Sequence, residues 1–255
     1  MPMIRRRGLL AMGAAVDLFV ESDSDAHSGE VLERAVRELR RLERILSPHR
    51  PDSQLSALNR GGGLRVGREL WEVIDVALAG REATGARYDP VVRVGRAPVA
   101  GPAEPGVARD ARTGEVRLAG GVTLDAGEVV QAWCLDAVAD VLRAAGPCFA
   151  GDGSAAAFSG LPEKGPWIEL PLDRGGIATA RLRRPGPAGG RVADALAEVT
   201  IVAQTAAWAE MRARSLLASG MSAATREALA LGFDCVLTPA GGPARPFGAF
   251  AAAGI

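Results

Sequence analysis

Three polar side chains at one strand-to-helix corner are the first candidates for chemistry. The stretch LDAGEVVQAWCLDAVADVL, residues 124–142, starts as a strand end, turns through Asp125 and a glycine, and continues as an amphipathic helix. A strand that feeds a helix through Asp-x-Gly is typical of sites that hold a phosphate or a metal. The start of this helix presents Glu128 and Gln131 and no cation. The alternative role of Asp125 is to cap the helix.

A second pair of charged residues lies in a helix predicted over residues 205–220. Glu210 and Arg214 are four residues apart, which places both side chains on one face of that helix. The pair is either an ordinary salt bridge on the surface or part of a charged site.

Composition excludes several kinds of site and partner. Lys164 is the only lysine, so no other position offers a lysine nucleophile or a lysine that clamps a phosphate. His27 and His49 are the only histidines, which excludes a multi-histidine metal site. Thirty basic and thirty acidic residues cancel, and a neutral chain has no global field for nucleic acid or membranes. We expect neither as a partner.

The cysteines and the first residues bear on localisation. Cys134, Cys148 and Cys235 are widely spaced and form no CxxC motif, which predicts buried thiols in the reducing cytoplasm. Arginines at 5–7 precede an apolar run, which raises the alternative of a twin-arginine export signal. That run is short and Asp17 interrupts it, so we favour a cytoplasmic strand. No stretch is long enough to span a membrane.

Hydrophobic periodicity predicts an α+β fold with mixed, largely antiparallel sheets flanked by helices. Strands and helices do not alternate strictly, which disfavours a doubly wound sheet. We expect a single domain over residues 1–255, with the alternative of two intertwined sub-lobes and a weakly structured tail over 239–255. The predicted helices cover residues 24–46, 52–59, 68–84, 128–142, 205–220 and 222–233, and the predicted strands cover residues 12–20, 166–173, 175–183, 197–204 and 234–239, with two short strands within 147–160 and one near Val116 in the loop 95–121.

Five segments carry a further signal through their order and spacing. They are Met12-Gly13, LERILSPHRPDSQLSALN (42–59), TGARYDPVV (84–92), the corner at 124–142, and PWIELPL followed by AEVTIVAQTAAWAEMRARSLLASG. In this order they resemble the motifs of the FAD:protein FMN transferases, the flavin transferase family also called ApbE or thiamine-biosynthesis lipoprotein. The resemblance runs from about residue 12 to residue 238.

The resemblance implies a fold and an activity. The fold would be the flavin-transferase architecture, similar to a T-fold. The activity would be Mg²⁺-dependent transfer of FMN from FAD to a threonine of a flavoprotein acceptor, with release of AMP. FAD and Mg²⁺ would be the cofactors, and the acceptor would be the partner. Such phosphoryl transfer depends mainly on positioning and on neutralisation of charge.

Five positions match family residues that contact the flavin nucleotide. The resemblance implies this role for Met12, His49, Tyr88, Asp89 and Asp125. For each of the first four, the residue type also allows an ordinary structural role. Met12 would be a core methionine, His49 an exposed loop residue, and Tyr88 a filler of the core. Asp89, before a proline, would start a turn.

Four positions match the phosphate and metal region, and each of them carries a different residue from the family. Gln131 replaces a lysine that faces FAD, and loss of a charge-assisted contact costs about 1.5–3 kcal/mol. Glu128 stands where a backbone carbonyl helps to hold the metal. Glu210 and Arg214 stand where the family has metal-binding aspartate and threonine. We expect Gln131 and Arg214 to be catalytic, and Glu128, Glu210 and Arg214 to form the metal site, in which Arg214 occupies the metal position and neutralises a phosphate or Glu210.

The largest departure from the family is a missing loop motif. A histidine-containing flavin-binding loop should fall within residues 183–198, which contain no histidine, and Asp194 is only a partial match. The chain therefore resembles a divergent flavin transferase. Two alternatives stay open: a non-catalytic relative that binds a flavin or a partner protein through a degenerate active site, and a relative recruited to another small-molecule reaction.

Overall fold

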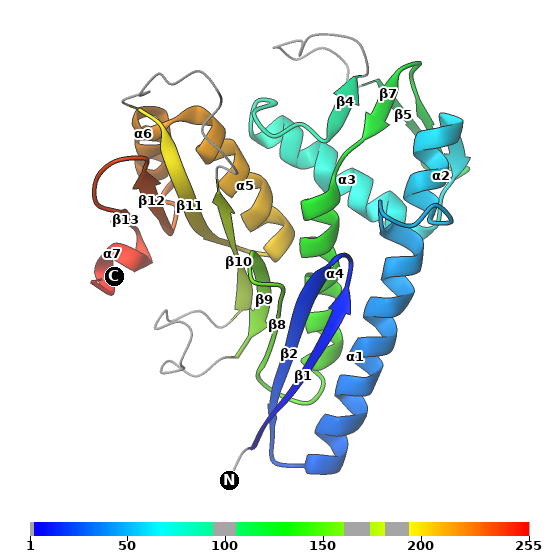
Figure 1. The fold of residues 1–255 in the computed structure, drawn as a ribbon, viewed down its shortest axis with the longest axis horizontal. Helices are drawn as coiled ribbons and strands as arrows, with labels where there is room; N and C mark the ends of the chain where they lie inside the picture. The colour runs from blue at the N-terminus through cyan, green and yellow to red at the C-terminus, as the bar shows by residue number, and fades with distance from the viewer. Residues whose placement is uncertain (1–2, 94–105, 161–173, 182–193, 255) are drawn as a thin grey trace.

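A computed structural model of the chain describes residues 3–93, 106–160, 174–181 and 194–254 (Figure 1). Within these ranges, helices combine with sheets in which every strand pair is antiparallel. The predicted α+β class is therefore confirmed.

One large sheet runs through the molecule. Its strand order is β1-β2-β8-β9-β10-β11-β12-β13. Its strands are β1 (Met3–Ala11), β2 (Ala14–Ser22), β8 (Cys148–Gly151), β9 (Ala155–Ser159), β10 (Arg174–Arg181), β11 (Leu196–Ala203), β12 (Cys235–Pro239) and β13 (Arg245–Phe247).

Two small sheets lie at the other end of the molecule. Strands β3, β6 and β5 form one, and β4 pairs with β7 in the other. The strands are β3 (Gly63–Arg65), β4 (Val91–Arg93), β5 (Val107–Asp110), β6 (Glu115–Leu118) and β7 (Val122–Leu124).

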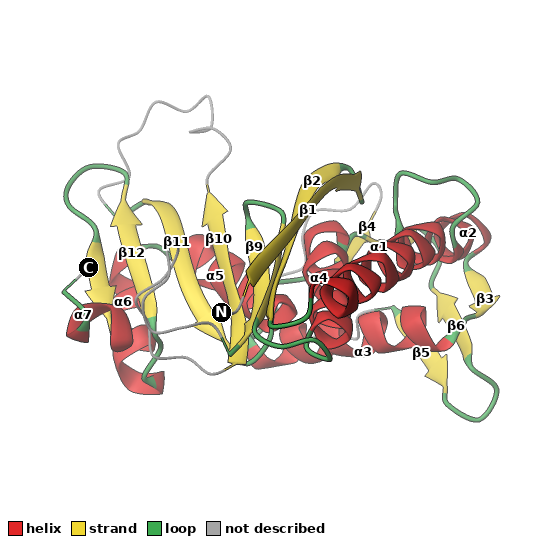
Figure 2. Cartoon of the chain, turned by 90° about the horizontal axis from the view of Figure 1, so that it is seen from below, coloured by secondary structure: helices red, strands yellow, loops and turns green. Residues whose placement is uncertain are grey.

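The helix α4 lies at the centre of the packing. It contacts α1, α5 and the strands β8 and β9, while α5 packs on β10 and β11, so both helices lie along one face of the large sheet (Figure 2). In the described ranges, no helix has the length and apolar character needed to cross a membrane. The helices are α1 (Asp25–Leu46), α2 (Gln54–Gly61), α3 (Arg68–Ala83), α4 (Gly127–Leu142), α5 (Ala206–Ser219), α6 (Met221–Leu231) and α7 (Ala249–Ala252).

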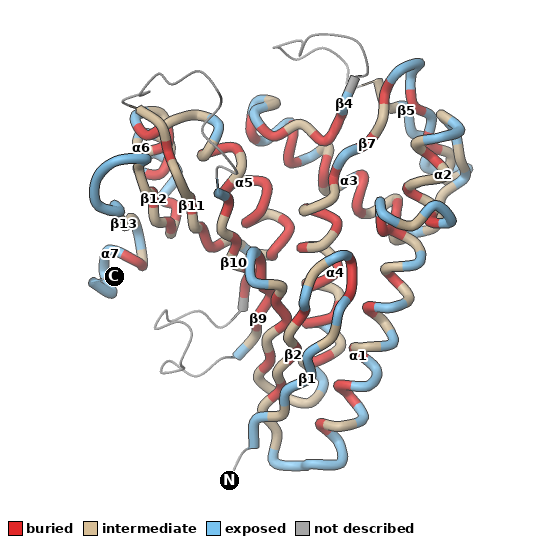
Figure 3. The backbone as a smooth tube through the Cα atoms, viewed as in Figure 1, coloured by how far each residue is buried: buried red, intermediate tan, exposed pale blue. Residues whose placement is uncertain are grey.

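The long helix α1 follows from its sequence pattern. Ser24 caps it by accepting a hydrogen bond from the backbone N–H of His27, and Ser47 before a proline ends it. Its apolar residues recur at helical spacing, so one face enters the core while the charged face meets solvent (Figure 3). The apolar residues buried on this face are Val31, Leu32, Ala35, Leu39, Leu42 and Leu46.

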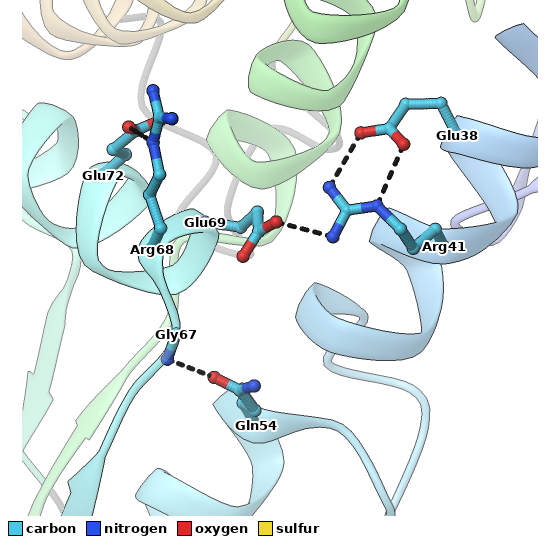
Figure 4. Close-up of polar contacts among 7 residues, drawn as sticks. All are labelled: Glu38, Arg41, Gln54, Gly67, Arg68, Glu69 and Glu72. Carbon is cyan, nitrogen blue, oxygen red and sulfur yellow. Dashed lines mark hydrogen bonds and ion pairs between the residues drawn. The ribbon is translucent and has the colours of Figure 1, made fainter.

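Polar contacts fix α1, α2 and α3 relative to one another (Figure 4). The guanidinium of Arg41 donates two hydrogen bonds to Glu38 on its own helix and a third, at 2.5 Å, to Glu69 on α3. Gln54, at the start of α2, accepts a hydrogen bond from the backbone N–H of Gly67 at 2.8 Å, just before α3 begins.

The N-terminal prediction needs correction. Met12 does not lie inside one strand over residues 12–20. It lies in the two-residue turn between β1 and β2, where Met12 and Gly13 have φ of +55° and +82°. This is the left-handed region, which glycine tolerates and methionine adopts only under constraint. Residues 3–11 form an edge strand that the sequence pattern did not indicate, because the strand is largely exposed.

Other elements also differ from the expectation. In the described part of the loop predicted over residues 95–121, residues 106–121, there are two strands, β5 and β6, rather than one. The C-terminal tail, for which we expected little structure, contains β13 and α7, and Asp234 accepts a hydrogen bond from the backbone N–H of Ala249 at 2.7 Å. The strand predicted over residues 166–173 and most of the loop predicted over 183–195 lie outside the described residues.

The approach of α5 to the sheet yields a stability prediction. A Cβ added at Gly176 on β10 would lie 1.9 Å from the backbone nitrogen of Ala206, at the start of α5. Because backbone cannot move aside as a side chain can, Gly176→Ala should destabilise the protein by about 3 kcal/mol or more. Chemical unfolding measures this, with Gly120→Ala as the control because a Cβ there meets no atom within 4 Å. Equal stabilities for the two variants would contradict the close approach.

Candidate functional site

The corner where β7 feeds α4 is held from two sides. Asn59 on α2 donates a hydrogen bond to the carbonyl of Leu124 at 2.9 Å and accepts one from its N–H at 2.8 Å. The N–H of Asp125 donates to the carbonyl of Pro90 at 2.8 Å. The Asp125 side chain is exposed and does not cap α4, whose N-cap is Ala126. Its carboxylate is therefore held at the corner with no structural task among the described residues.

The Met12 turn meets α4 through Gln131. The Gln131 amide donates a hydrogen bond to the carbonyl of Met12 at 2.6 Å, and Glu43 on α1 accepts from the N–H of Met12 at 2.7 Å. These two contacts hold the turn in its unusual backbone conformation. A Cβ added at Gly13 would lie 3.3 Å from the His49 ring, so His49 lies against the same turn. The structure thus brings together three of the predicted residues, and the Met12 side chain itself is buried in the core.

Arg214 joins two carboxylates from two helices. Its Nη2 lies 2.7 Å from Oε1 of Glu128 on α4, and its Nε lies 2.5 Å from Oε1 of Glu210 on α5. The Glu210 side chain is 3% exposed, whereas those of Arg214 and Glu128 are 37% and 41% exposed. The predicted i,i+4 pair is therefore present, but it is buried at one end and includes a third residue.

Burial and charge oppose each other at this cluster. Burial raises the pKa of Glu210, and the positive charge and hydrogen bond of Arg214 act against that rise. Burial works to lower the pKa of Arg214, and the carboxylates of Glu210 and Glu128 outweigh it, so the pKa is raised. Arg214 therefore stays charged and provides the counter-charge that the buried Glu210 needs.

Tyr88 also lies at this cluster. Burial raises its pKa, and the charges of Arg214, Glu210, Asp125 and Glu128 act on it as well. Its hydroxyl is buried and has no hydrogen-bond partner among the described residues. A buried hydroxyl without a partner is costly in a folded protein, and this cost marks Tyr88 as a candidate site residue.

Asp89 has a structural role that its position before a proline predicted. Its Oδ1 accepts a hydrogen bond from the N–H of Val91 at 3.0 Å, and its Oδ2 lies 3.1 Å from Nε of the nearly buried Arg81. Asp194 likewise caps α6, since its Oδ1 accepts hydrogen bonds from the N–H and the hydroxyl of Ser222. Neither contact involves the Arg214 cluster.

Two residues that the sequence analysis did not select position this site. One is Glu43, which holds the Met12 turn. The other is Asp136 on α4, whose carboxylate accepts hydrogen bonds from the N–H groups of Ala206 and Ala207 at 2.7 and 3.0 Å. These are free N–H groups of the first turn of α5. Asp136 therefore fixes α5, with Glu210 and Arg214, against α4. The position of Asp136 in its own helix does not predict this contact, because Ala206 lies 70 residues further along the chain.

The described residues do not fit a magnesium site. No group of three or more His, Cys, Asp or Glu side chains in the described ranges is placed to hold a metal ion. Both predicted carboxylate ligands, Glu128 and Glu210, are bound to the Arg214 guanidinium. Mg²⁺ requires near-ideal octahedral coordination by oxygen, and a fixed cation between two ligands opposes it. Glu128, Glu210 and Arg214, which were predicted to form the metal site, thus lie together but form a salt bridge.

Comparison with known proteins gives a family and a fold. Residues 12–168 match the ApbE family, and no curated protein sequence matches the chain. The fold is similar to the crystal structure of the ApbE protein from Thermotoga maritima, with 18% identity, a TM-score of 0.75 and coverage of 96% of this chain and 97% of that one. It is also similar to the apo form of the flavinyl transferase ApbE from Pseudomonas stutzeri, with 18% identity, a TM-score of 0.79 and coverage of 98% and 97%. The flavin transferase ApbE from Vibrio cholerae gives 17% identity, a TM-score of 0.80 and coverage of 99% of both chains.

The role of Asp136 yields a pH prediction. Burial raises the pKa of Asp136 from 3.8 to about 6, although the N–H groups of α5 oppose the rise. A raised pKa in the folded state favours the protonated carboxyl, so its contribution to stability is greatest below pH 3.8 and is lost as the pH rises through 6. Asp136→Asn should cost about 1–3 kcal/mol through mismatched hydrogen bonds. Its deficit relative to the wild type should shrink between about pH 4 and pH 7.

Chemical unfolding across this pH range measures the difference, with Asp23→Asn, at an exposed position before α1, as the control. A deficit that grows with pH would show that the N–H groups of α5 outweigh burial and hold the carboxylate ionised.

Proposed function

The chain belongs to the ApbE family, and from this premise we propose that it binds FAD at the corner formed by the Met12 turn, α4 and α5, and transfers FMN to a threonine of a flavoprotein acceptor. One observation carries the proposal. The positions that match the family's nucleotide and phosphate residues converge from three parts of the chain, with α4 supplying both the contact to the turn and the contact to Arg214.

The flavin half of FAD would lie near the Met12 turn and the exposed His49 ring. The phosphates would lie near Arg214, whose guanidinium has N–H donors that Glu128 and Glu210 do not use. The Tyr88 hydroxyl is a further donor for this region. These residues would orient the pyrophosphate and offset part of its charge, which is the main requirement of phosphoryl transfer.

The reaction would exchange a phosphoanhydride bond of FAD for a phosphoester bond to the acceptor. The threonine Oγ of the acceptor forms a bond to the phosphorus of the FMN half, and the pyrophosphate P–O bond to AMP breaks. AMP leaves, and the threonine proton passes to AMP or to solvent. Because the described residues do not fit Mg²⁺, no step of this proposal uses a bound metal. We therefore expect transfer to be slow.

A second candidate is a non-catalytic relative that binds a flavin or a partner protein. It is favoured because the side chains of Gln131 and Arg214 already have hydrogen-bond partners within the protein. Gln131 is engaged with the Met12 carbonyl, and Arg214 with the carboxylates of Glu128 and Glu210. Cys134, Cys148 and Cys235 are free and buried, which supports a reducing compartment and a cytoplasmic location for either function.

A direct assay separates the two candidates. The wild-type protein and a triple variant, Gln131→Lys with Glu210→Asp and Arg214→Thr, are incubated with FAD, Mg²⁺ and a threonine-bearing acceptor domain from a flavoprotein. Mass spectrometry then reads the acceptor for added FMN. We expect slow transfer by the wild type and faster, Mg²⁺-dependent transfer by the triple variant. Flavin binding without transfer by either protein would favour the non-catalytic candidate.

The substitution at Gln131 yields a prediction about affinity. The family resemblance implies a lysine that faces FAD at position 131, and a neutral amide there loses about 1.5–3 kcal/mol relative to a charged donor. Gln131→Lys should therefore tighten FAD binding by one to two orders of magnitude, as measured by calorimetry. Gln204→Lys, which adds the same charge at an exposed position, is the control. A sub-micromolar Kd for the wild-type protein would contradict the account of a weakened phosphate site.

A further inference from the structure

We infer that the Arg214 guanidinium is a tethered replacement for a divalent cation, so that the wild-type corner takes up no metal and acquires a metal site when Arg214 is removed. The inference rests on the proposed function in one respect: the proposed function assigns this corner to the phosphates of a bound nucleotide. Its charge argument rests on the contacts of Glu128, Glu210 and Arg214.

The first support is the arrangement of the two carboxylates. The Oε1 atoms of Glu128 and Glu210 contact two nitrogens of one planar guanidinium, at 2.7 and 2.5 Å. The two oxygens therefore lie close to each other although they come from different helices. Two carboxylates that approach in this way need either a cation between them or a shared proton, because like charges at short range repel. Among the described residues, Arg214 is the cation that fills this place.

The second support is burial. The Glu210 side chain is 3% exposed, so solvent cannot compensate its charge. Glu210 and Arg214 lie four residues apart on α5, which keeps the guanidinium beside this carboxylate whenever the helix is formed. A free ion at this place would exchange with solvent, whereas the arginine is covalently fixed and always charged.

The third support is what the guanidinium leaves unused. Arg214 has five N–H donors in a fixed fork, and its contacts with the described residues use Nε and Nη2. Nη1 therefore remains for an oxygen of a bound anion. Tyr88 is 7% exposed, and its hydroxyl has no hydrogen-bond partner among the described residues. A metal ion at this place would likewise bind the carboxylates and present its remaining coordination positions to a phosphate.

Metal binding in the absence of flavin tests the inference. Mn²⁺ binding, followed by paramagnetic resonance, and thermal unfolding with Mg²⁺ or with EDTA are measured on four proteins. These are the wild type, Arg214→Thr, Arg214→Lys and the control Arg212→Thr. Arg212 lies on the same helix but stacks on Trp208 and Phe233, away from the two carboxylates.

The expected result separates the four proteins. Arg214→Thr removes the cation and offers a hydroxyl oxygen beside two carboxylates, so it should bind Mn²⁺ at least about tenfold more tightly than the wild type. Its unfolding temperature should be low in EDTA and rise with Mg²⁺. Arg214→Lys keeps a cation and should behave like the wild type, as should Arg212→Thr in its metal response.

Two results would overturn the inference. One is saturable Mn²⁺ binding by the wild type that Glu210→Gln abolishes, since the corner would then hold a metal with Arg214 in place. The other is an Arg214→Thr protein that folds and gains no metal affinity. If Arg214→Thr does not fold, the wild-type Mn²⁺ measurement still decides. Because no flavin is present, failure of the proposed function leaves this test unaffected.

Discussion

The salt bridge from Arg214 to Glu128 and Glu210 is the interaction on which the rest of the corner depends. It joins α4 to α5 through Glu128 on the first helix and Glu210 and Arg214 on the second. Without the guanidinium, the buried carboxylate of Glu210 on α5 would face a second carboxylate on α4 and would lack a counter-charge. After removal of the arginine, Glu210 would need another cation or a proton to neutralise its charge, so the charge balance of the corner also determines which ions the corner can hold.

The helix α4 connects the parts of this site through three successive contacts on its polar residues. Glu128 reaches Arg214, Gln131 reaches the carbonyl of Met12, and Asp136 holds the first turn of α5. These contacts set the distance between the Met12 turn and α5, which is the space that a flavin nucleotide would occupy under the proposed function. The same contacts stabilise the packing of α4 against α5 and the Met12 turn.

Local patterns predicted the elements whose causes are local. The helix α1 follows from the spacing of its apolar residues and from the Ser-Pro pair that ends it. The β1–β2 hairpin was missed because the alternation over residues 12–20 continues through the turn and the edge strand before it is mostly exposed. The contact of Glu128 with Arg214 joins two separate helices, and that of Asp136 joins residues 70 apart, so no periodicity reveals either. The family resemblance identified Glu128, Glu210 and Arg214 as site residues. In the structure they contact one another, whereas a metal or a phosphate was the expected partner.

The central claim is that a protein side chain, and not a metal, supplies the positive charge between Glu128 and Glu210. The most direct measurement is an anomalous difference map from crystals of the wild-type protein soaked in Mn²⁺. Our account predicts guanidinium density between the two carboxylates and no manganese peak there. A strong anomalous peak within bonding distance of both carboxylates, with Arg214 turned towards solvent, would contradict it.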